Sequence, residues 1–271
     1  MEHVLSPFVL CRRLYHLGFI RASTLIDACE VDWEELQEAI VDYQEFHGLK
    51  VDGWVGPETE ASLQALRFCG HPDVLGMEHA TTPCKWAHKN IRWTLTGILS
   101  GFEEPVFRRA YQTAWARWSE ICAIQPEYTE SIAGANVIIG FGAIDGGLGT
   151  LAWSELPCGA PRQLRQLYDH NENWVITDGA TSGRQIDLTR VACHEIGHVL
   201  GIPHLKDGNL MGAMYSSAIW KPQADDITEG VRRYGSVVPL PPPPPPPLPP
   251  SEDVIVAFPH PVTRILVRGL N

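Results

Sequence analysis

The sequence HEIGHVLGIPH, at residues 194–204, indicates both the fold class and the chemistry of this chain. On a helix, His194 and His198 are about one turn apart, so both imidazoles leave the same face. Gly201 can adopt the positive φ that ends a helix and reverses the chain. His204 can then supply a third ligand from outside the helix. The stretch therefore predicts a metal site made of three histidines.

The same stretch predicts a catalytic rather than a structural metal site. Three protein ligands leave the fourth position of a zinc ion open to water, which is typical of catalytic zinc. Glu195 directly follows the first ligand and can take a proton from that water. The alternative is a chance HExxH pair on a polar helix face, but Gly201 and His204 extend the pattern to HExxHxxGxxH. The extended motif resembles that of the metzincin metallopeptidases.

Composition limits the class of protein. The chain has 271 residues, of which 44% are hydrophobic, so it can bury one or two cores. Its net charge of -11 argues against nucleic acid or an anionic membrane surface as the main partner. No stretch approaches the roughly 18–20 apolar residues of a membrane span. The opening residues lack a basic region, and the short apolar run that follows contains Pro7, so we expect no ordinary signal peptide.

The chain has seven cysteines, so at least one thiol is unpaired. Cys193 adjoins His194 in the motif helix and is expected to be a small buried side chain. The spacing assigns no disulfide among the remaining cysteines, which are Cys11, Cys29, Cys69, Cys84, Cys122 and Cys158.

Residues 1–68 predict a small helical domain. Apolar residues in the stretch 31–46 recur with helical period at positions 33, 36, 39, 40, 43 and 46, with Asp32 as N-cap, and Pro57 begins another helix. The segments YQEFHGL (43–49), VDG (51–53) and VGPET (55–59) resemble the peptidoglycan-binding-like three-helix module. Such modules anchor some proteins to cell walls and form the propeptide domain of matrixins. The resemblance thus leaves peptidoglycan as a further partner through residues 1–68.

The next segment, RFCGHPDV at residues 67–74, resembles the cysteine switch of matrixins, which usually reads PRCGxPDV. Phe68 stands where the arginine normally does, so the arginine that steadies the propeptide is in doubt. A thiolate is a strong zinc ligand, so Cys69 can fill the fourth position and keep the site latent. The alternative is an ordinary free cysteine in a loop. The resemblance implies a switch and activation segment over residues 69–83.

Residues 84–236 predict a second domain of mixed structure. Strands are expected at Lys85-Trp86 and 91–95, at 135–141 and at 149–156. Helices are expected at 102–121, with Val106, Ala110, Ala114 and Trp118 on one face, and at 187–200. This order resembles the matrixin catalytic domain. The expected fold class is therefore α+β: a mixed twisted sheet with long helices, preceded by the small three-helix domain.

The segment MGAMY, residues 211–215, resembles the methionine turn of the family. In that register Met211 is the turn methionine, and Ala213 and Tyr215 line the S1′ pocket; Met214 is the alternative turn residue. Asp225 and its neighbour Asp226 resemble the paired aspartates of the closing helix. We expect these aspartates to bond locally to the zinc helix or the methionine turn.

Three acidic residues resemble the calcium site of matrixins. Asp145 opens the segment DGGLGTLA (145–152), and Asp169 and Glu172 match the residues that complete the site. Calcium takes six to eight oxygen ligands, which three carboxylates and loop carbonyls can supply. The alternative is a plain Asp-Gly hairpin turn beside a solvated acidic loop. The cofactors expected are therefore catalytic zinc and structural calcium.

The C-terminal part reads as a spacer and a tail. Residues 237–250 are rich in proline and predict a polyproline II linker. Residues 251–271 form a short tail to which the sequence assigns no role.

Together these features predict a zinc endopeptidase that acts on proteins or peptides and is made as a latent precursor. The resemblance to matrixins implies an extracellular location. Glu195 would deprotonate the attacking water, and Cys69 would block the site until the propeptide is removed. One rival is a cell-wall protease or hydrolase anchored to peptidoglycan. A second rival is a non-catalytic wall-binding protein, against which the intact Glu195 argues.

Overall fold

A computed structural model of the chain describes residues 6–20, 33–74, 84–147, 149–159, 161–177 and 181–237. All of these belong to one compact unit, Met1–Pro239. The predicted Asp32 cap, nearly all of the polyproline linker and the tail lie outside the described residues. None of the helices in the described ranges has the length and apolar character that crossing a membrane requires.

Three short helices at the N-terminal end share one core. They are α1 (Pro7–His16), α2 (Trp33–Phe46) and α3 (Pro57–Leu63). Ser6 caps α1, and Pro57 begins α3 as predicted. The core contains Leu10, Cys11, Leu14, Leu17, Ile20, Leu36, Ala39, Ile40, Tyr43 and Leu63. The predicted helical period is confirmed at four positions of α2, but Trp33 is 56% exposed and faces Trp54 instead of this core.

A buried glutamine shapes the turn between α2 and α3. The Gln44 side chain accepts hydrogen bonds from the backbone N–H groups of Asp52 and Gly53 and donates to the Trp54 carbonyl and the Thr59 hydroxyl. Gly53 has φ 72, which glycine adopts without strain. One amide thus satisfies four groups of the turn, which explains why Gln44 can be buried.

The main sheet is mixed and six-stranded, with the order β1-β5-β6-β4-β2-β3. Its strands are β1 (Arg67–Cys69), β2 (Asn90–Leu95), β3 (Gln125–Tyr128), β4 (Val137–Gly142), β5 (Thr150–Ser154) and β6 (Leu164–Asp169). Only β5 and β6 pair antiparallel; the other neighbours are parallel. A small parallel pair, β7 (Trp174–Val175) and β8 (Ile186–Asp187), leads into the motif helix. The predicted α+β class with a mixed sheet is confirmed.

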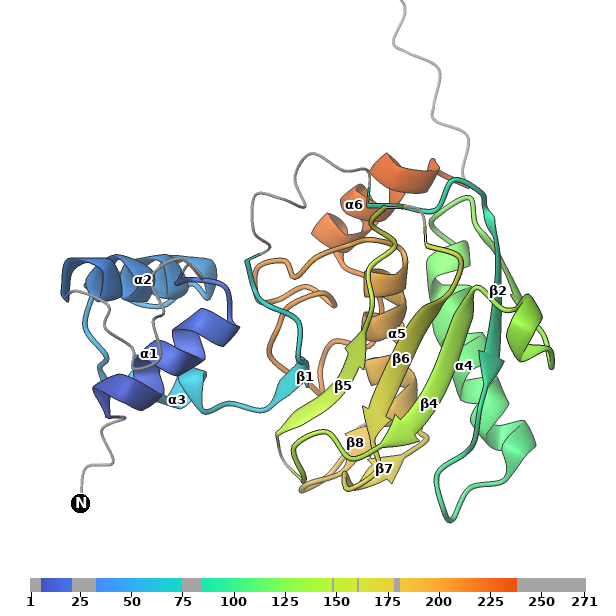
Figure 1. Ribbon diagram of the computed structural model, residues 1–271, viewed down its shortest axis with the longest axis horizontal. Helices are drawn as coiled ribbons and strands as arrows, with labels where there is room; N and C mark the ends of the chain where they lie inside the picture. The colour runs from blue at the N-terminus through green and yellow to red at the C-terminus, as the bar shows by residue number, and fades with distance from the viewer. Residues whose placement is uncertain are drawn as a thin grey trace, which may run out of the picture. The chain divides into compact units, whose positions relative to one another are not determined.

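Two long helices, α4 (Glu104–Ser119) and α5 (Leu188–Val199), lie on the same side of this sheet (Figure 1). The indole Nε1 of Trp118 on α4 donates to the Cys193 carbonyl on α5 at 2.8 Å. The predicted inner face of α4 is correct for Ala110, Ala114 and Trp118, but Val106 is 45% exposed. Phe107, one position further on, points into the core in place of Val106.

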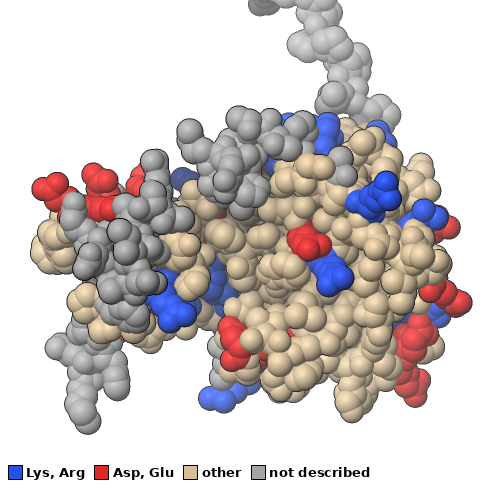
Figure 2. Space-filling view, viewed as in Figure 1, with Lys and Arg blue, Asp and Glu red and all other residues tan. Residues whose placement is uncertain are grey.

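The chain before β2 is not the strand that was expected at Lys85 and Trp86. Cys84 forms a disulfide with Cys158, and Trp86 donates its indole N–H to the Val199 carbonyl at the end of α5. These contacts hold the segment against the C-terminal end of the motif helix. The last described helix is α6 (Ala224–Tyr234). Figure 2 shows basic and acidic side chains interspersed on one face of the domain.

Candidate active site

The motif helix α5 is buried along its whole length. Asp187 caps its start by accepting a hydrogen bond from the Arg190 N–H at 2.7 Å. Gly201, with φ 84, follows the helix end, and a Cβ there would overlap the carbonyl of Cys84. Only glycine fits this turn, which returns the chain so that His204 faces the helix.

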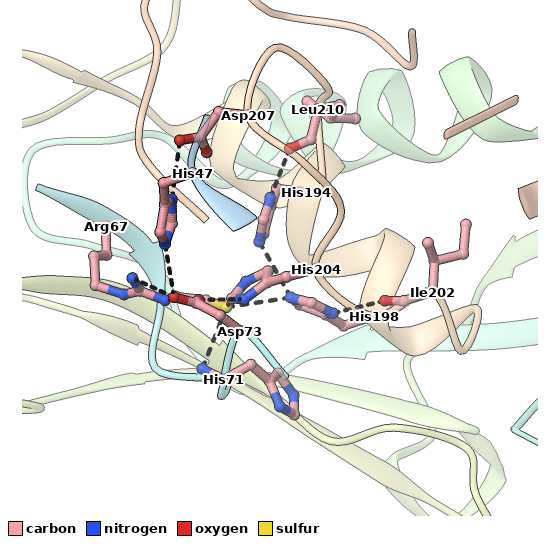
Figure 3. Close-up of polar contacts among 11 residues, drawn as sticks. His47, Arg67, His71, Asp73, His194, His198, Ile202, His204, Asp207 and Leu210 are labelled. Atoms are coloured by element: carbon pink, nitrogen blue, oxygen red, sulfur yellow. Dashed lines mark hydrogen bonds and ion pairs between the residues drawn. The ribbon is translucent and has the colours of Figure 1, made fainter. Parts of the chain in front are cut away.

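Three imidazoles and one thiol converge at a single point (Figure 3). The Nε2 atoms of His194 and His198 are 3.1 Å apart. Cys69 Sγ lies 3.2 Å from His198 Nε2 and 3.1 Å from His204 Nε2. All four side chains are buried, and their ligand atoms lie within 4.8 Å of one another.

The far nitrogen of each imidazole has a hydrogen-bond acceptor. His194 Nδ1 lies 2.7 Å from the Leu210 carbonyl, and His198 Nδ1 lies 2.8 Å from the Ile202 carbonyl. His204 Nδ1 lies 3.0 Å from the carboxylate of Asp73. Each Nδ1 therefore carries the proton, and each Nε2 directs a lone pair at the common point. Burial lowers the pKa of all three histidines, which keeps them neutral.

This donor set fits zinc. With zinc–nitrogen bonds of about 2.0–2.1 Å, the edges of a tetrahedral site are about 3.3 Å, close to the three separations of 3.1, 3.1 and 3.2 Å given above. Two buried lone pairs 3.1 Å apart repel unless a cation lies between them. Burial also raises the pKa of the Cys69 thiol, and the Glu195 carboxylate adds to this effect. A bound cation would reverse that effect and favour the thiolate.

Glu195 lies beside the cluster without being part of it. It is fully buried, and neither carboxylate oxygen forms a hydrogen bond of good geometry among the described residues, although Ser154 and Cys69 lie near enough to lower its pKa somewhat. Burial raises its pKa to about 8. A carboxyl group that is desolvated and unpaired next to a metal site is suited to hold and transfer a proton.

The segment predicted to be the methionine turn packs against α5. Met211 is fully buried, and its sulfur contacts Gly197 of α5, whereas Met214 forms a β-bridge with Arg67. The Asp226 carboxylate accepts from the backbone N–H groups of Leu210 and Met211 at 2.7 and 3.0 Å. The predicted local bond from this aspartate to the methionine turn is confirmed.

Strand β1 occupies the groove that leads to the cluster. On one side it pairs with β5, where Gly70 N donates to the Ala152 carbonyl. On the other side Phe68 N donates to the Ala213 carbonyl, and Tyr215 N donates to the Leu66 carbonyl. The segment thus forms an added strand between β5 and residues 213–215. Extended peptides bind many proteins by adding a strand in this way.

Phe68 fills the pocket next to the cluster. Its ring stacks on His194 at 4.5 Å between centroids and meets Tyr215 edge-on at 5.0 Å. The side chain is fully buried. The residue that departs from the expected switch pattern thus packs between His194 and Tyr215.

The doubt about the steadying arginine was wrong. Arg67 precedes the expected position by one residue, yet its guanidinium forms two hydrogen bonds with the Asp73 carboxylate. Both side chains are buried, so this ion pair closes the loop that presents Cys69. His71 adds a backbone N–H directed at Cys69 Sγ at 3.4 Å and an imidazole that packs on His198.

The predicted calcium residues do not form one group among the described residues. Asp169 accepts hydrogen bonds from the backbone N–H groups of Ile144, Asp145, Gly146 and Asn171. Asp145 accepts from Thr150 N. These two carboxylates therefore organise the loops directly, and calcium stays a prediction.

Sequence reasoning missed two groups near the cluster. Asp73 lies in the segment RFCGHPDV, but the sequence assigned no role to it. In the structure its carboxylate accepts hydrogen bonds from Arg67, His204 and His47. His47 lies in the segment YQEFHGL, to which no role in the metal site was assigned, but it is buried and contacts Asp73 and Asp207. The only signal for Asp73 was its place in the switch segment.

The mixed sheet, the two long helices and the three-histidine cluster define a metallopeptidase domain of the metzincin type. The family model described as matrixin matches residues 85–235, and that of the putative peptidoglycan-binding domain matches residues 9–63. The chain belongs to the matrixin family, whose members are zinc-dependent metallopeptidases.

Similar proteins come from plants and animals. Metalloendoproteinase 5-MMP of Arabidopsis thaliana is 30% identical over 76% of this chain and 66% of its own length. Metalloendoproteinase 1-MMP of the same plant is 29% identical over 94% of this chain and 75% of its own length. Matrix metalloproteinase-C of Caenorhabditis elegans is 29% identical over 66% of this chain. The chain spans just under two thirds of the first of these relatives and 32% of the last.

Proposed function

We propose that the protein is a zinc endopeptidase held latent by its own N-terminal segment. The observation that carries this proposal is the position of Cys69 Sγ, 3.1 and 3.2 Å from two of three convergent imidazole nitrogens. Residues 1–68 are then the prodomain, residues 69–83 the switch and activation segment, and residues 84–236 the catalytic domain.

The roles of the residues follow from their geometry. His194, His198 and His204 hold the metal through Nε2, and zinc, when bound there, polarises a carbonyl group and makes a water molecule more acidic. Glu195 accepts the proton of the attacking water and passes it to the leaving amine. The carbonyls of Leu210 and Ile202 fix the orientation of two of the ligands.

The groove indicates how substrate binds. Once the propeptide leaves, an extended peptide can take the place of β1 beside β5 and bond to the backbone of Ala152 and Ala213. The pocket filled by Phe68, between His194 and Tyr215, suits a large apolar side chain. We therefore infer that the substrates are proteins or peptides bound in extended form.

The family and the disulfides favour an extracellular site of action. Cys84 and Cys158 are paired, and Cys11 is also disulfide-bonded, which is typical of an oxidising compartment. The contacts of β1 favour the prodomain role for the first domain. Anchoring to peptidoglycan stays the second candidate, because residues 9–63 match a putative peptidoglycan-binding domain.

The test compares four forms of the zinc-loaded full-length chain on a library of peptides. We expect the unmodified chain to be nearly inactive, and a thiol-reactive mercurial or Cys69→Ala to release activity. Cys69→Ala combined with Glu195→Ala should abolish that activity. Equal turnover with and without Glu195 would refute the proposed enzymatic function. Binding of residues 1–75 to purified cell wall would favour the alternative in which the first domain anchors the protein to peptidoglycan.

A further inference from the structure

A buried histidine joins the prodomain to the catalytic domain. His47 follows the last residue of α2, and its side chain has no exposed surface. Its ring packs on Tyr43 of the same helix at 4.4 Å between centroids. The imidazole is thus held by the prodomain core while its two nitrogens face outward.

Both nitrogens of His47 face carboxylates. Nε2 lies 3.1 Å from Asp73 in the switch segment, and Nδ1 lies 3.0 Å from Asp207 in the loop after His204 (Figure 3). Ionised carboxylates only accept hydrogen bonds, so both nitrogens must donate. A neutral imidazole has one N–H and cannot satisfy this arrangement. The geometry requires the imidazolium.

The surrounding charges support this protonation state. Burial alone would lower the pKa of His47, but the hydrogen bonds to Asp207 and Asp73 outweigh it and raise the pKa. Asp73 also interacts electrostatically with Arg13, Tyr43, Arg67, Cys69 and His204. Arg67 and His204 bond to Asp73, whose pKa lies well below its usual range.

We propose that His47 is a charged clamp that ties Asp73 to Asp207 and so keeps the switch segment closed over the metal site. This inference rests on the proposed latency by Cys69. The clamp is tight while His47 is protonated and loosens when it loses the proton. Because the pKa is raised in the closed state, the stabilisation is complete below the open-state value of about 6.5. It is lost as the pH rises through the raised value.

The test measures how fast Cys69 reacts with a thiol reagent in the zinc-loaded full-length chain. A Glu195→Gln background prevents self-cleavage, and mass spectrometry of the Cys69 peptide separates it from the buried Cys122 and Cys193. His47→Gln, which cannot carry charge, is compared with the same background at each pH from 5.5 to about 9, a range that brackets the histidine pKa. Exposed His88→Gln is the matched control.

We expect His47→Gln to accelerate labelling about tenfold at pH below about 6.5, as loss of charge-assisted hydrogen bonds predicts. The ratio of the two rates should fall toward one as the pH rises. Asp207→Asn should reproduce the effect, and the double variant should add little to it. A ratio of one at every pH, or a raised ratio that does not change with pH, would overturn the clamp.

Two further readouts separate the possible failures. Thermal unfolding of each variant shows whether the fold is retained, and Asp207→Asn tests the clamp from the catalytic side if His47→Gln does not fold. If Cys69 of the background protein is labelled as fast as a free thiol at every pH, the proposed latency itself fails. If Cys69 is protected from labelling but neither His47→Gln nor Asp207→Asn changes the labelling rate, only the clamp is refuted.

Discussion

Replacing Phe68 by alanine should open the switch while leaving the metal ligands intact. The Phe68 ring is fully buried between His194 and Tyr215, so opening the groove exposes all of it. Burying a phenylalanine contributes about 1.5–3 kcal/mol, and each aromatic contact adds about 0.5–1.5 kcal/mol. With two such contacts the closed state should therefore lose about 2.5–6 kcal/mol, which raises the ratio of open to closed molecules about 60- to 20,000-fold.

The assay is peptide hydrolysis by the zinc-loaded full-length chain without any activator. Phe68→Ala should show turnover that rises with the open fraction, and its rate after full activation should equal that of the unmodified chain. Val51→Ala, at a position 52% exposed in the N-terminal domain, is the matched control and should stay latent. If Phe68→Ala hydrolyses peptide without activator no faster than the Val51→Ala control, the Phe68 side chain does not stabilise the closed state.

Three further predictions concern the support of the site. Gly201→Ala places a Cβ against the Cys84 carbonyl at a residue with positive φ. The free energy of unfolding in urea should therefore fall by more than about 2 kcal/mol. An unchanged value would contradict the claim that only glycine fits this turn. Asp226→Ala leaves the Leu210 and Met211 N–H groups unpaired and should cost about 2–4 kcal/mol by the same measurement, with Asp225→Ala as control. Removing zinc with a chelator should lower the melting temperature of the unmodified chain, because zinc binds the folded state; a variant with His194 and His198 both replaced by alanine should not respond.

The metal site was predictable because its information is local. His194, His198 and Glu195 share one helix, and Gly201 fixes the turn before His204, so spacing alone brings these groups together. The role of Asp226 was also predictable in outline, since it follows the methionine turn closely in sequence. Helical period identified α4 and most of its inner face but chose Val106 over its neighbour Phe107, because only packing in the core decides between these two adjacent residues.

Cys69 was predicted from its motif, but the side chains that hold its segment in place were not predictable, because their partners are distant in sequence. His47 and Asp207 are separated by 160 positions, and no local pattern links them. The order of the sheet has the same origin, since β1 pairs with β5, a strand that is far from it in the sequence. Arg67 shows a different limit: the motif placed the arginine one residue later, whereas in this chain the arginine that bonds to Asp73 is residue 67.

The most direct test of the account is the first coordination shell of zinc in the full-length chain, measured by X-ray absorption at the zinc edge. We expect three imidazole nitrogens at about 2.0–2.1 Å and one sulfur at about 2.3 Å. The sulfur should disappear in Cys69→Ala and be replaced by a light atom. A shell without sulfur in the unmodified latent chain would contradict the claim that Cys69 closes the site.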